Sequence, residues 1–500
     1  MRYICTRDEM QAIDAASIHQ LGIPGIVLME KAAMAMEEEI LARFSPSSSV
    51  LVLAECGNNG GDGLALARLL HARGFTVTVC EIGGVKKASD SYRIQKEILE
   101  NLDIPLYDKL PEADYDILID AVFGVGLTRA VSGIWADLIS ELNSRKGFKI
   151  AVDVPSGVDA SNGRVLSCAF KADLTVTFGL MKVGLLLWPG ASYAGEVIVK
   201  EIGFPARAVE MISPRAVSYD MTDLERLPCR DPWSNKGSYG RVLLVAGSRN
   251  MAGAAFLSAL SAYRSGAGLV RIFTCEDNRE ILQTLMPEAI MTTFRDEEEG
   301  RRLLSEALEW ATVIGIGPGL GVNRMSRICL ETVLSKGTVP VVIDADGLNV
   351  LAESMGSGNE LESSFRNYPA GIILTPHLKE MERLTGKPVS CIRENLIALA
   401  EEAADPGHIY VLKDARTIVS DGAGPAYINQ SGNHGMSQGG SGDVLTGIIC
   451  GFLAGGLPLL EAARLGVYCH GLAGDAAAAE KGYYGMGARD IARCLSQVIH

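Results

Sequence analysis

SVLVLAEC, residues 49–56, runs directly into GNNGGDGLALARLL, residues 57–70, and this stretch identifies the fold class. The first segment is a short, almost continuous apolar run, as in a strand that is buried on both faces of a parallel sheet. The second segment places a glycine-rich turn at residues 57–63 and then a helical pattern. A strand, a turn and a helix in this order are typical of an α/β domain with a mostly parallel sheet.

The same alternation continues towards residue 203. Five more apolar segments are expected to form strands, at residues 75–83, 115–124, 149–157, 172–179 and 196–203. Helical spacing precedes the first strand, at residues 6–20 and 26–44. These helices could cover one face of the sheet or pack against a second subunit, and we expect a homo-oligomer.

The pattern weakens between Phe204 and Trp233, where four prolines occur. We place a domain boundary within about ten residues of position 215. A second α/β series follows, with a helix at residues 253–265 and two closing helices at residues 443–453 and 459–481. Its strands are expected at residues 241–247, 269–273, 312–317, 339–346, 371–376, 408–414 and 417–421. The predicted domains are therefore residues 1–215 and 225–500.

Composition excludes several classes of protein. The chain has 500 residues, too many for one ordinary core, and 48% of them are hydrophobic. A net charge of −14 and the lack of a basic stripe argue against nucleic acid as a partner. Eleven cysteines without a CxxC pair indicate reduced thiols. No run approaches the ~18 apolar residues of a membrane span, and the start lacks a signal-peptide pattern. We expect a cytoplasmic protein.

Polar residues follow the strands of the first domain. Asp120 ends one apolar run, and Asp153 and Ser156 follow the next. Because ligands of open α/β sheets bind beyond the carboxyl ends of the strands, these residues can share a crevice with Asn58 and Asn59. Oxygen ligands with few carboxylates suit a monovalent cation. Asp120 could instead cap a turn, and Ser156 could form an ST-turn. Asp153 is placed for acid–base chemistry.

The second domain carries GGSGDVLTG at residues 439–447, just before an apolar helix. The motif GxxxxGK[ST] is absent from the sequence, so backbone amides at the helix start would hold a phosphate. Asp443 lies in the first turn of this helix. We interpret it as the base that accepts a hydroxyl proton during phosphoryl transfer. The alternative is an ordinary acidic residue that stabilises the helix dipole.

Three further segments of the second domain fit a nucleotide and substrate cleft. LKDARTIV places Lys413, Arg416 and Thr417 between two strands, where they can meet phosphates, although a solvated charged hairpin is an alternative. GIGPGLG, residues 315–321, is either a close backbone approach to a ligand or a plain glycine turn. His377 follows a strand and a proline, which favours a substrate contact over a core histidine.

Residues 1–215 resemble the NAD(P)H-hydrate epimerases, through GNNGGDG at 57–63, DAVFGVGLTR at 120–129 and AVDVPSGVDA at 151–160. The resemblance implies a Rossmann-like three-layer domain in which Asp153 is catalytic and K⁺ binds Asn59, Asp120 and Ser156. It also implies that the hydrated nicotinamide nucleotide binds Asn58, Asn59, Gly60, Gly61, Asp62, Gly124, Val125, Gly126, Leu127, Thr128, Arg129, Ala130 and Asp153.

Residues 225–500 resemble the ribokinase-like superfamily, and within it the NAD(P)H-hydrate dehydratases. The matching motifs are SNKGSYG at 234–240, GPGLG at 317–321, DADGLNVL at 344–351, LTPHLKEM at 374–381, LKDART at 412–417 and GNHGMSQGGSGDVLTG at 432–447. The resemblance implies that Ala254, Gly319, His377 and Asp443 contact the hydrate. It implies nucleotide binding by Lys413, Asp414, Ala415, Arg416, Thr417 and Gly442. Asn235 stands where many members have histidine.

Together the resemblances imply a bifunctional repair enzyme. It would interconvert R- and S-NADHX or NADPHX and dehydrate the S epimer, with ADP or ATP as phosphoryl donor and Mg²⁺. One alternative is a ribokinase-like small-molecule kinase that releases a phosphorylated product. A second is that the first domain is a binding or interaction module, since related domains of RNA-decapping proteins resemble it. The retained Asp153 and the asparagine pair argue against that second alternative.

Overall fold

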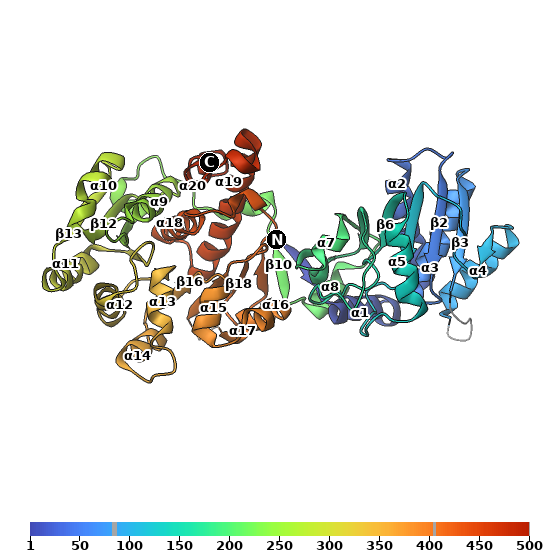
Figure 1. Cartoon of the computed structure of the whole chain (residues 1–500), viewed down its shortest axis with the longest axis horizontal. Coiled ribbons are helices and arrows are strands. Elements are labelled where there is room, and N and C mark those ends of the chain that lie inside the picture. Colours follow the sequence, from blue (N-terminus) through green and yellow to red (C-terminus); the bar gives the residue numbers. More distant parts are fainter. Residues whose placement is uncertain (83–87, 404–406, 500) are drawn as a thin grey trace. The chain divides into compact units, whose positions relative to one another are not determined.

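The chain divides into two units in the computed structural model, which describes residues 1–82, 88–403 and 407–499. One unit is Tyr3–Ala216, called here the N-terminal unit. The other is Val217–His500 together with Met1–Arg2, called here the C-terminal unit. Both units are α/β folds built on largely parallel sheets (Figure 1).

The N-terminal unit is built on a parallel sheet with the strand order β4-β3-β2-β5-β6-β7-β9. All six strands predicted for this unit are present. The short β4 was not predicted, and Gly83, the last residue of one predicted strand, lies outside the described residues. The bounds are β2 (Ser49–Ala54), β3 (Thr76–Glu81), β4 (Leu106–Tyr107), β5 (Ile117–Ala121), β6 (Phe148–Val152), β7 (Leu174–Phe178) and β9 (Glu196–Lys200).

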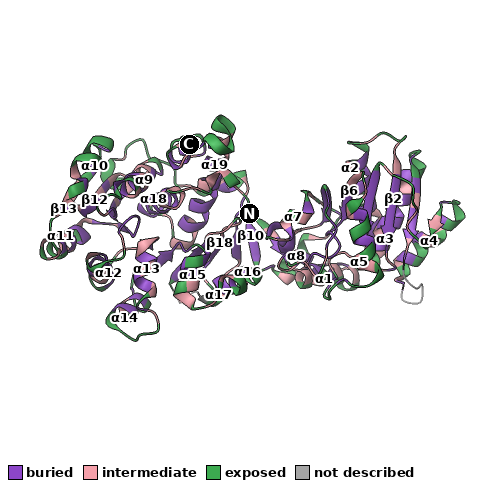
Figure 2. Cartoon of the chain, in the orientation of Figure 1, coloured by how far each residue is buried: buried purple, intermediate pink, exposed green. Residues whose placement is uncertain are grey.

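Helices cover both faces of this sheet. Alternate residues of a strand point to opposite faces, so Val50 and Val52 of β2 meet the core beneath α2 (Gly25–Leu41), α3 (Asn58–Ala72) and α4 (Asp90–Asn101). Leu51 and Leu53 point the other way, into the core beneath α5 (Ile134–Ser144). The central strands of the sheets are buried in both units (Figure 2). This is the predicted three-layer arrangement.

Short elements complete the N-terminal unit. β1 (Arg2–Cys5) pairs in parallel with β8 (Met181–Lys182), away from the main sheet. α1 (Arg7–Ala15) continues into a π-helical turn, η1 (Ala16–Gln20), and packs on α8 (Ala206–Ile212). Two single turns, α6 (Val183–Leu186) and α7 (Ala191–Ala194), precede β9.

The glycine-rich segment after β2 differs from its prediction. It was expected to be a turn, but α3 begins at Asn58, so most of the segment is already helical. Its glycines permit close packing instead. A Cβ on Gly60 would lie 1.6 Å from the carbonyl oxygen of Glu55, and one on Gly63 would lie 2.4 Å from Cβ of Ala121. The glycines therefore bring the start of α3 against the ends of β2 and β5.

The sheet of the C-terminal unit runs in the order β13-β12-β11-β14-β15-β16-β17-β18-β19. From β13 to β17 in this order, each strand is parallel to the next, whereas the pairs β17–β18 and β18–β19 are antiparallel. All seven predicted strands are present; β13 and β19 were not predicted. The bounds are β11 (Arg241–Val245), β12 (Leu269–Cys275), β13 (Ile290–Phe294), β14 (Val313–Ile316), β15 (Val341–Ile343), β16 (Ile372–Leu374), β17 (His408–Leu412), β18 (Ile418–Ser420) and β19 (Ala426–Ile428).

Two helices of the C-terminal unit position its predicted site. α9 (Ala252–Arg264) and α18 (Ser441–Ala454) approach closely, because a Cβ on Gly447 would lie 2.2 Å from the carbonyl oxygen of Ser258. α19 (Leu459–Gly485) follows α18 and contains one non-helical residue, Gly482. Among the described residues, no helix is both long and apolar enough to cross a membrane.

The remaining elements of the C-terminal unit connect or cover these strands. The helices are α10 (Arg279–Leu285), α11 (Glu297–Trp310), α12 (Arg324–Lys336), α13 (Asp346–Ala352), α14 (Glu360–Arg366), α15 (Leu378–Thr385), α16 (Val389–Glu394), α17 (Leu396–Ala403) and α20 (Ala488–Cys494). The short turns are η3 (Met221–Arg226), η4 (Lys236–Tyr239), η5 (Glu276–Asn278), η6 (His434–Met436) and η7 (Leu495–Gln497), and β10 (Ala216–Ser218) lies at the boundary between the units.

Candidate active sites

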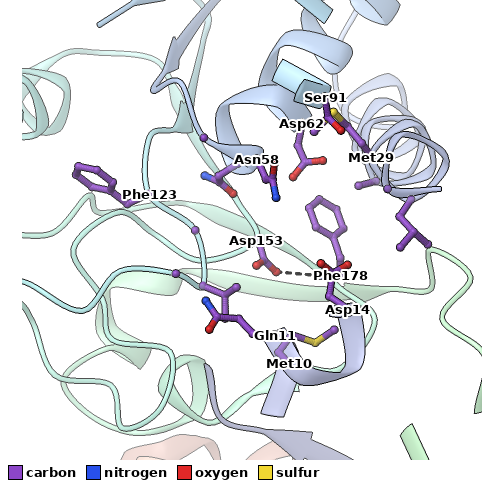
Figure 3. Close-up of a pocket in the computed structure, with 18 of the residues that line it drawn as sticks. Met10, Gln11, Asp14, Met29, Asn58, Asp62, Ser91, Phe123, Asp153 and Phe178 are labelled. Carbon is purple, nitrogen blue, oxygen red and sulfur yellow. Dashed lines mark hydrogen bonds between the residues drawn. The ribbon is translucent and has the colours of Figure 1, made fainter. Parts of the chain in front are cut away.

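A cavity of about 950 Å³ lies at the carboxyl ends of β5 and β6 in the N-terminal unit (Figure 3). Its wall comes from α1, α2, the start of α3 and the loop after β5. Most of the residues predicted to bind the hydrate line it: Asn58, Asn59, Asp62, Gly124, Val125, Gly126, Leu127, Thr128, Arg129 and Asp153. Gly60, Gly61 and Ala130 are not part of the wall. Gly60 and Gly61 pack behind it, against Glu55 and Met29.

Asp153 is fixed in one orientation. It follows β6 with a φ of 64°, in the left-handed region that aspartate tolerates better than most residues. Its Oδ1 atom accepts hydrogen bonds from Lys182 Nζ at 2.6 Å, Thr177 Oγ1 at 2.9 Å and the Phe178 amide at 3.2 Å. With Oδ1 occupied, Oδ2 is the oxygen left to act on a ligand.

Lys182 was missed by the sequence reasoning. Its side chain is only 1% exposed and forms an ion pair with Asp153. Its ammonium group also donates to the Phe178 carbonyl at 2.7 Å and to Thr177 Oγ1 at 2.8 Å, so all three protons are used. The signal in the sequence is the single lysine within GLMKVGLLLW, residues 179–188, because an unpaired lysine is rarely buried.

We predict that Lys182→Met destabilises the N-terminal unit, because it leaves the Asp153 carboxylate without its buried cation. Removal of one partner from a buried pair costs about 3–5 kcal/mol. Equilibrium unfolding in urea measures the change, with Lys171→Met as a control at an exposed lysine of the same unit. The control is expected to stay within about 0.5 kcal/mol of the wild type. A loss below about 1 kcal/mol in Lys182→Met would contradict a stabilising role for the pair.

Asp120 and Ser156 lie together beside this cavity. Asp120 accepts hydrogen bonds from the Ser156 amide at 2.7 Å and from Ser156 Oγ at 2.6 Å. Burial raises the pKa of Asp120 to about 6, although the hydrogen bonds from Ser156 oppose this effect. Among the described residues, Asp120 has no cationic partner. The Ser156 hydroxyl does not form an ST-turn. It donates a hydrogen bond to Asp120 and accepts one from the Phe123 amide.

Asn59 approaches the loop after β5. A Cβ on Gly124 would lie 2.5 Å from Asn59 Oδ1, so a glycine is required there. The Nδ2 atom of Asn59 is buried, and within the described part of the chain it has no hydrogen-bond partner. A buried amide without a partner costs about 1–3 kcal/mol and is often satisfied by a ligand.

The predicted phosphate site of the C-terminal unit is at the start of α18. Gly440 precedes the helix with a φ of 92°, and Asp443 lies in the first turn, as predicted. A Cβ on Gly442 would lie 3.4 Å from Lys413 Nζ and 3.6 Å from Asp344 Oδ2. Residues predicted from two distant motifs therefore meet here. Burial, with Asp344 as a further contribution, raises the pKa of Asp443 to about 7.

Asp344, like Lys182, is a residue of a candidate site for which the sequence predicted no role. It follows β15 and is 1% exposed. Its carboxylate accepts hydrogen bonds from Lys413 Nζ at 2.7 Å, Thr375 Oγ1 at 2.7 Å and Thr446 Oγ1 at 2.8 Å. Burial alone would raise its pKa, but Lys413 and these hydrogen bonds outweigh burial and hold the pKa of Asp344 below its usual value. The signal for Asp344 in the sequence was a carboxylate directly after the apolar run VPVVI, residues 339–343.

The other predicted residues of this unit lie nearby. Lys413, Asp414, Ala415, Arg416 and Thr417 connect β17 to β18, as predicted, and the Lys413 amide bonds to the Pro376 carbonyl beside His377. Arg416 donates to the Gln430 carbonyl at 3.0 Å.

Ala254 and Gly319 come from different elements and meet. A Cβ on Gly319 would lie 2.8 Å from the Cβ of Ala254. Gly319 has a φ of 58°, as suits a close backbone approach.

Two polar side chains serve as helix caps. His377 accepts a hydrogen bond from the Glu380 amide at 3.1 Å and caps α15. With its side chain 49% exposed, it is not a core histidine. Asn235 caps η4, where its side chain accepts the Gly237 amide at 2.8 Å.

Comparisons with known proteins match both units. A family model described as NAD(P)H-hydrate dehydratase matches residues 242–497, and one described as the N-terminus of YjeF-related proteins matches residues 25–184. A bifunctional NAD(P)H-hydrate repair enzyme of Thermofilum pendens is 35% identical over 495 residues, which cover 96% of this chain and 92% of that protein. The protein of that name from Escherichia coli is 32% identical, over 99% of this chain and 92% of its own.

Among solved structures, a ribokinase-like superfamily protein from Enterococcus faecalis is 32% identical to the matched region. The match covers 57% of this chain and 95% of that protein, with a TM-score of 0.51. The fold and the site of the C-terminal unit thus define a ribokinase-like α/β protein, joined here to a three-layer α/β domain. With relatives at this identity along its whole length, the chain belongs to the family of bifunctional NAD(P)H-hydrate repair enzymes.

Proposed function

We propose that this enzyme repairs hydrated nicotinamide cofactors. Residues 1–215 interconvert the R and S epimers of NADHX and NADPHX, and residues 225–500 dehydrate the S epimer to NADH or NADPH. The main support for the proposal is that one family motif in each unit places a carboxylate at a candidate active site. Asp153 faces a cavity of about 950 Å³, and Asp443 lies in the first turn of α18, whose Gly442 approaches Lys413.

Dehydration uses the start of α18. Asp443 accepts the proton of the ring hydroxyl, whose oxygen then attacks the terminal phosphorus of ADP or ATP, and the bond from that phosphorus to its bridging oxygen breaks to release AMP or ADP. The C–O bond breaks next, assisted by the lone pair of the ring nitrogen, and the neighbouring carbon loses a proton. Phosphate leaves far more readily than hydroxide. In this proposal Lys413, Asp414, Ala415, Arg416, Thr417 and Gly442 bind the nucleotide, while Ala254, Gly319 and His377 contact the hydrate.

The residues present fit the two metal ions of the proposal. K⁺ would be held by oxygen atoms of Asn59, Asp120 and Ser156, and it would neutralise the buried carboxyl of Asp120. No cluster of three acidic, histidine or cysteine ligands occurs within the described residues. Mg²⁺ usually binds through one or two carboxylates together with substrate phosphates, so in this proposal it would enter the site with the nucleotide. When bound, Mg²⁺ would supply charge neutralisation on the phosphoryl group.

Metal removal is expected to separate the two activities. Replacement of K⁺ by tetramethylammonium should slow epimerisation, because the buried Asp120 carboxylate then lacks a cation small enough for the site. Chelation of Mg²⁺ should stop dehydration alone. Both rates are measured by chromatography of the two epimers, with K⁺ or Mg²⁺ restored as the control. Epimerisation that is equally fast without K⁺ would contradict the potassium site.

The rate of dehydration should depend on pH through Asp443. Its pKa is raised to about 7, and a base acts only when it has lost its proton. We therefore expect the rate at saturating substrate to rise as the pH increases through about 7, and to level off above it. Initial rates of NADH formation from pH 5.5 to 8.5 measure this dependence. A rate that is flat between pH 6 and 8 would count against Asp443 as the base.

One assay tests the proposed function as a whole. The purified chain is incubated with mixed R and S hydrates, with ADP, with ATP and with neither, and both epimers are followed beside the absorbance of the dihydronicotinamide. Loss of both epimers with a nucleotide supports the proposal. Loss of S alone would exclude the epimerase, and a stable phosphorylated product would favour the small-molecule kinase.

Self-association and location complete the proposal. Val27, Met34 and Leu41 repeat every seven residues along α2 and are between 37% and 53% exposed, which supports a homo-oligomer that buries this stripe. Light scattering of the wild type and of Met34→Glu tests this point. We place the enzyme in the cytoplasm, where exposed thiols such as Cys229 and Cys391 stay reduced.

A further inference from the structure

We propose that Asp62 is a second catalytic residue of the epimerase, and that it is the acid that protonates the ring nitrogen while Asp153 removes the hydroxyl proton. This inference rests on the proposed epimerase function and goes beyond it, since family resemblance assigns Asp62 only to substrate binding. It gives Asp62 and Asp153 opposite tasks.

The geometry gives the two carboxyl groups different surroundings. Asp62 projects from α3 and Asp153 follows β6, and both line the cavity, with their carboxyl groups facing the same space (Figure 3). Asp153 Oδ1 accepts three hydrogen bonds, one of them from the ammonium group of Lys182. In the part of the chain that the structure describes, the carboxyl group of Asp62 has neither a hydrogen-bond nor an ion-pair partner.

The surroundings of Asp62 favour its protonated form. Burial raises the pKa of Asp62 well above its usual value, and the nearby charges of Asp153 and Asp14 raise it further, while Lys182 lowers it. Asp62 therefore keeps its proton to a higher pH than an exposed aspartate does. Asp153, paired with Lys182, is placed to accept one. Pairs of carboxyl groups in contrasting environments divide acid and base roles between them.

Asp14, Glu55 and Asp90 also line this cavity, and of these three Asp14 is the one whose charge acts on Asp62. Burial raises its pKa too, but the charge of His19 opposes that effect. Lys182 opposes the effect of burial at Asp62 in the same way, but the pKa of Asp62 is still raised well above its usual value, and Asp62 follows the two asparagines that line the same wall. Asp62 is thus the better proton donor of the two.

The chemistry of the substrate needs one base and one acid. The hydrated carbon bears a hydroxyl group and is bonded to the ring nitrogen. Asp153 takes the hydroxyl proton, the O–H electrons form a C=O bond, and the C–N bond breaks. Its electron pair goes to nitrogen, which takes the proton of Asp62. Rotation of the open-chain aldehyde presents its other face. Closure reverses every step, so that Asp62 and Asp153 regain their starting states and no electrons are gained or lost.

The test measures conversion of the R to the S epimer by the full chain, without nucleotide and after subtraction of the uncatalysed rate. Asp62→Asn should lower kcat by about 10²- to 10⁴-fold with little change in KM. Asp137→Asn, at an exposed position in the first turn of α5, is the matched control. An unchanged kcat, or a rise in KM alone, would make Asp62 a binding residue and overturn the proposal.

If Asp62→Asn does not fold, two other measurements test whether Asp62 is the acid. The wild-type kcat should fall on the alkaline side as Asp62 loses its proton, and this limb should move in Asp62→Glu; its absence overturns the proposal. Hydrate labelled with ¹⁸O at the hydroxyl should yield S epimer that keeps the label. Solvent oxygen in the product would mean that water leaves instead, and would overturn protonation at nitrogen. A wild type that interconverts no epimers refutes the epimerase function itself, which is a distinct result.

Discussion

Asp443→Asn should lower nucleotide-dependent dehydration by about 10²- to 10⁴-fold, the usual contribution of a general base. The asparagine keeps the size of the side chain but cannot accept the hydroxyl proton. The helix start and its backbone amides remain, so nucleotide binding should change little. The measurement is the rate of NADH formation from the S epimer at saturating ADP or ATP, together with the KM of each substrate.

The same preparation contains its own control. Epimerisation depends on the N-terminal unit and should proceed at the wild-type rate in Asp443→Asn. Near-normal dehydration would show that another group removes the proton, and would leave Asp443 as an ordinary acidic residue that stabilises the helix dipole, worth about 0.3–1 kcal/mol.

Asp153→Asn should have the reciprocal effect. We expect epimerisation to fall by about 10²- to 10⁴-fold, because the amide can neither accept the hydroxyl proton nor pair with the ammonium group of Lys182. Dehydration of pure S hydrate should continue. With a mixture of both epimers and a nucleotide, the S epimer should disappear, while the R epimer is consumed only at the slow uncatalysed rate of interconversion.

Stability must be measured beside this activity. Asp153→Asn leaves Lys182 buried without a counter-ion, which destabilises the N-terminal unit. Urea unfolding of the same preparation shows whether the unit is folded under assay conditions. The double variant Asp153→Asn with Lys182→Met removes both charges and should recover much of the stability while remaining inactive. If this double variant epimerises at the wild-type rate, Asp153 is not the base.

The fold was predictable because most of the strands can be recognised from their local sequence pattern. Strands such as β2 and β11 are buried on both faces and read as continuous apolar runs. β4 has two residues and β19 has three, too few for a pattern to be visible. The glycine-rich segment after β2 was mistaken for a turn. Its glycines meet the Glu55 backbone and Ala121, and no local pattern distinguishes a close approach from a turn.

The positions of candidate site residues in the fold were predictable where a single motif contains the residue and the backbone that holds it. Asp153 and Asp443 each lie in a motif with its own backbone geometry. Lys182 is separated from Asp153 by 29 residues, and Asp344 from Lys413 by 69. Such partners meet only through the order of the strands, and a single sequence holds no record of that pairing. The surroundings that set each carboxylate's protonation were therefore beyond sequence reasoning.

The division of the chain into two units, each with its own carboxylate site, has a genetic consequence. We propose that the epimer made at one site reaches the other by diffusion, so that two defective copies need not share a polypeptide to restore repair. A cell that carries one allele damaged at Asp153 and another damaged at Asp443 should behave as wild type, by complementation in trans.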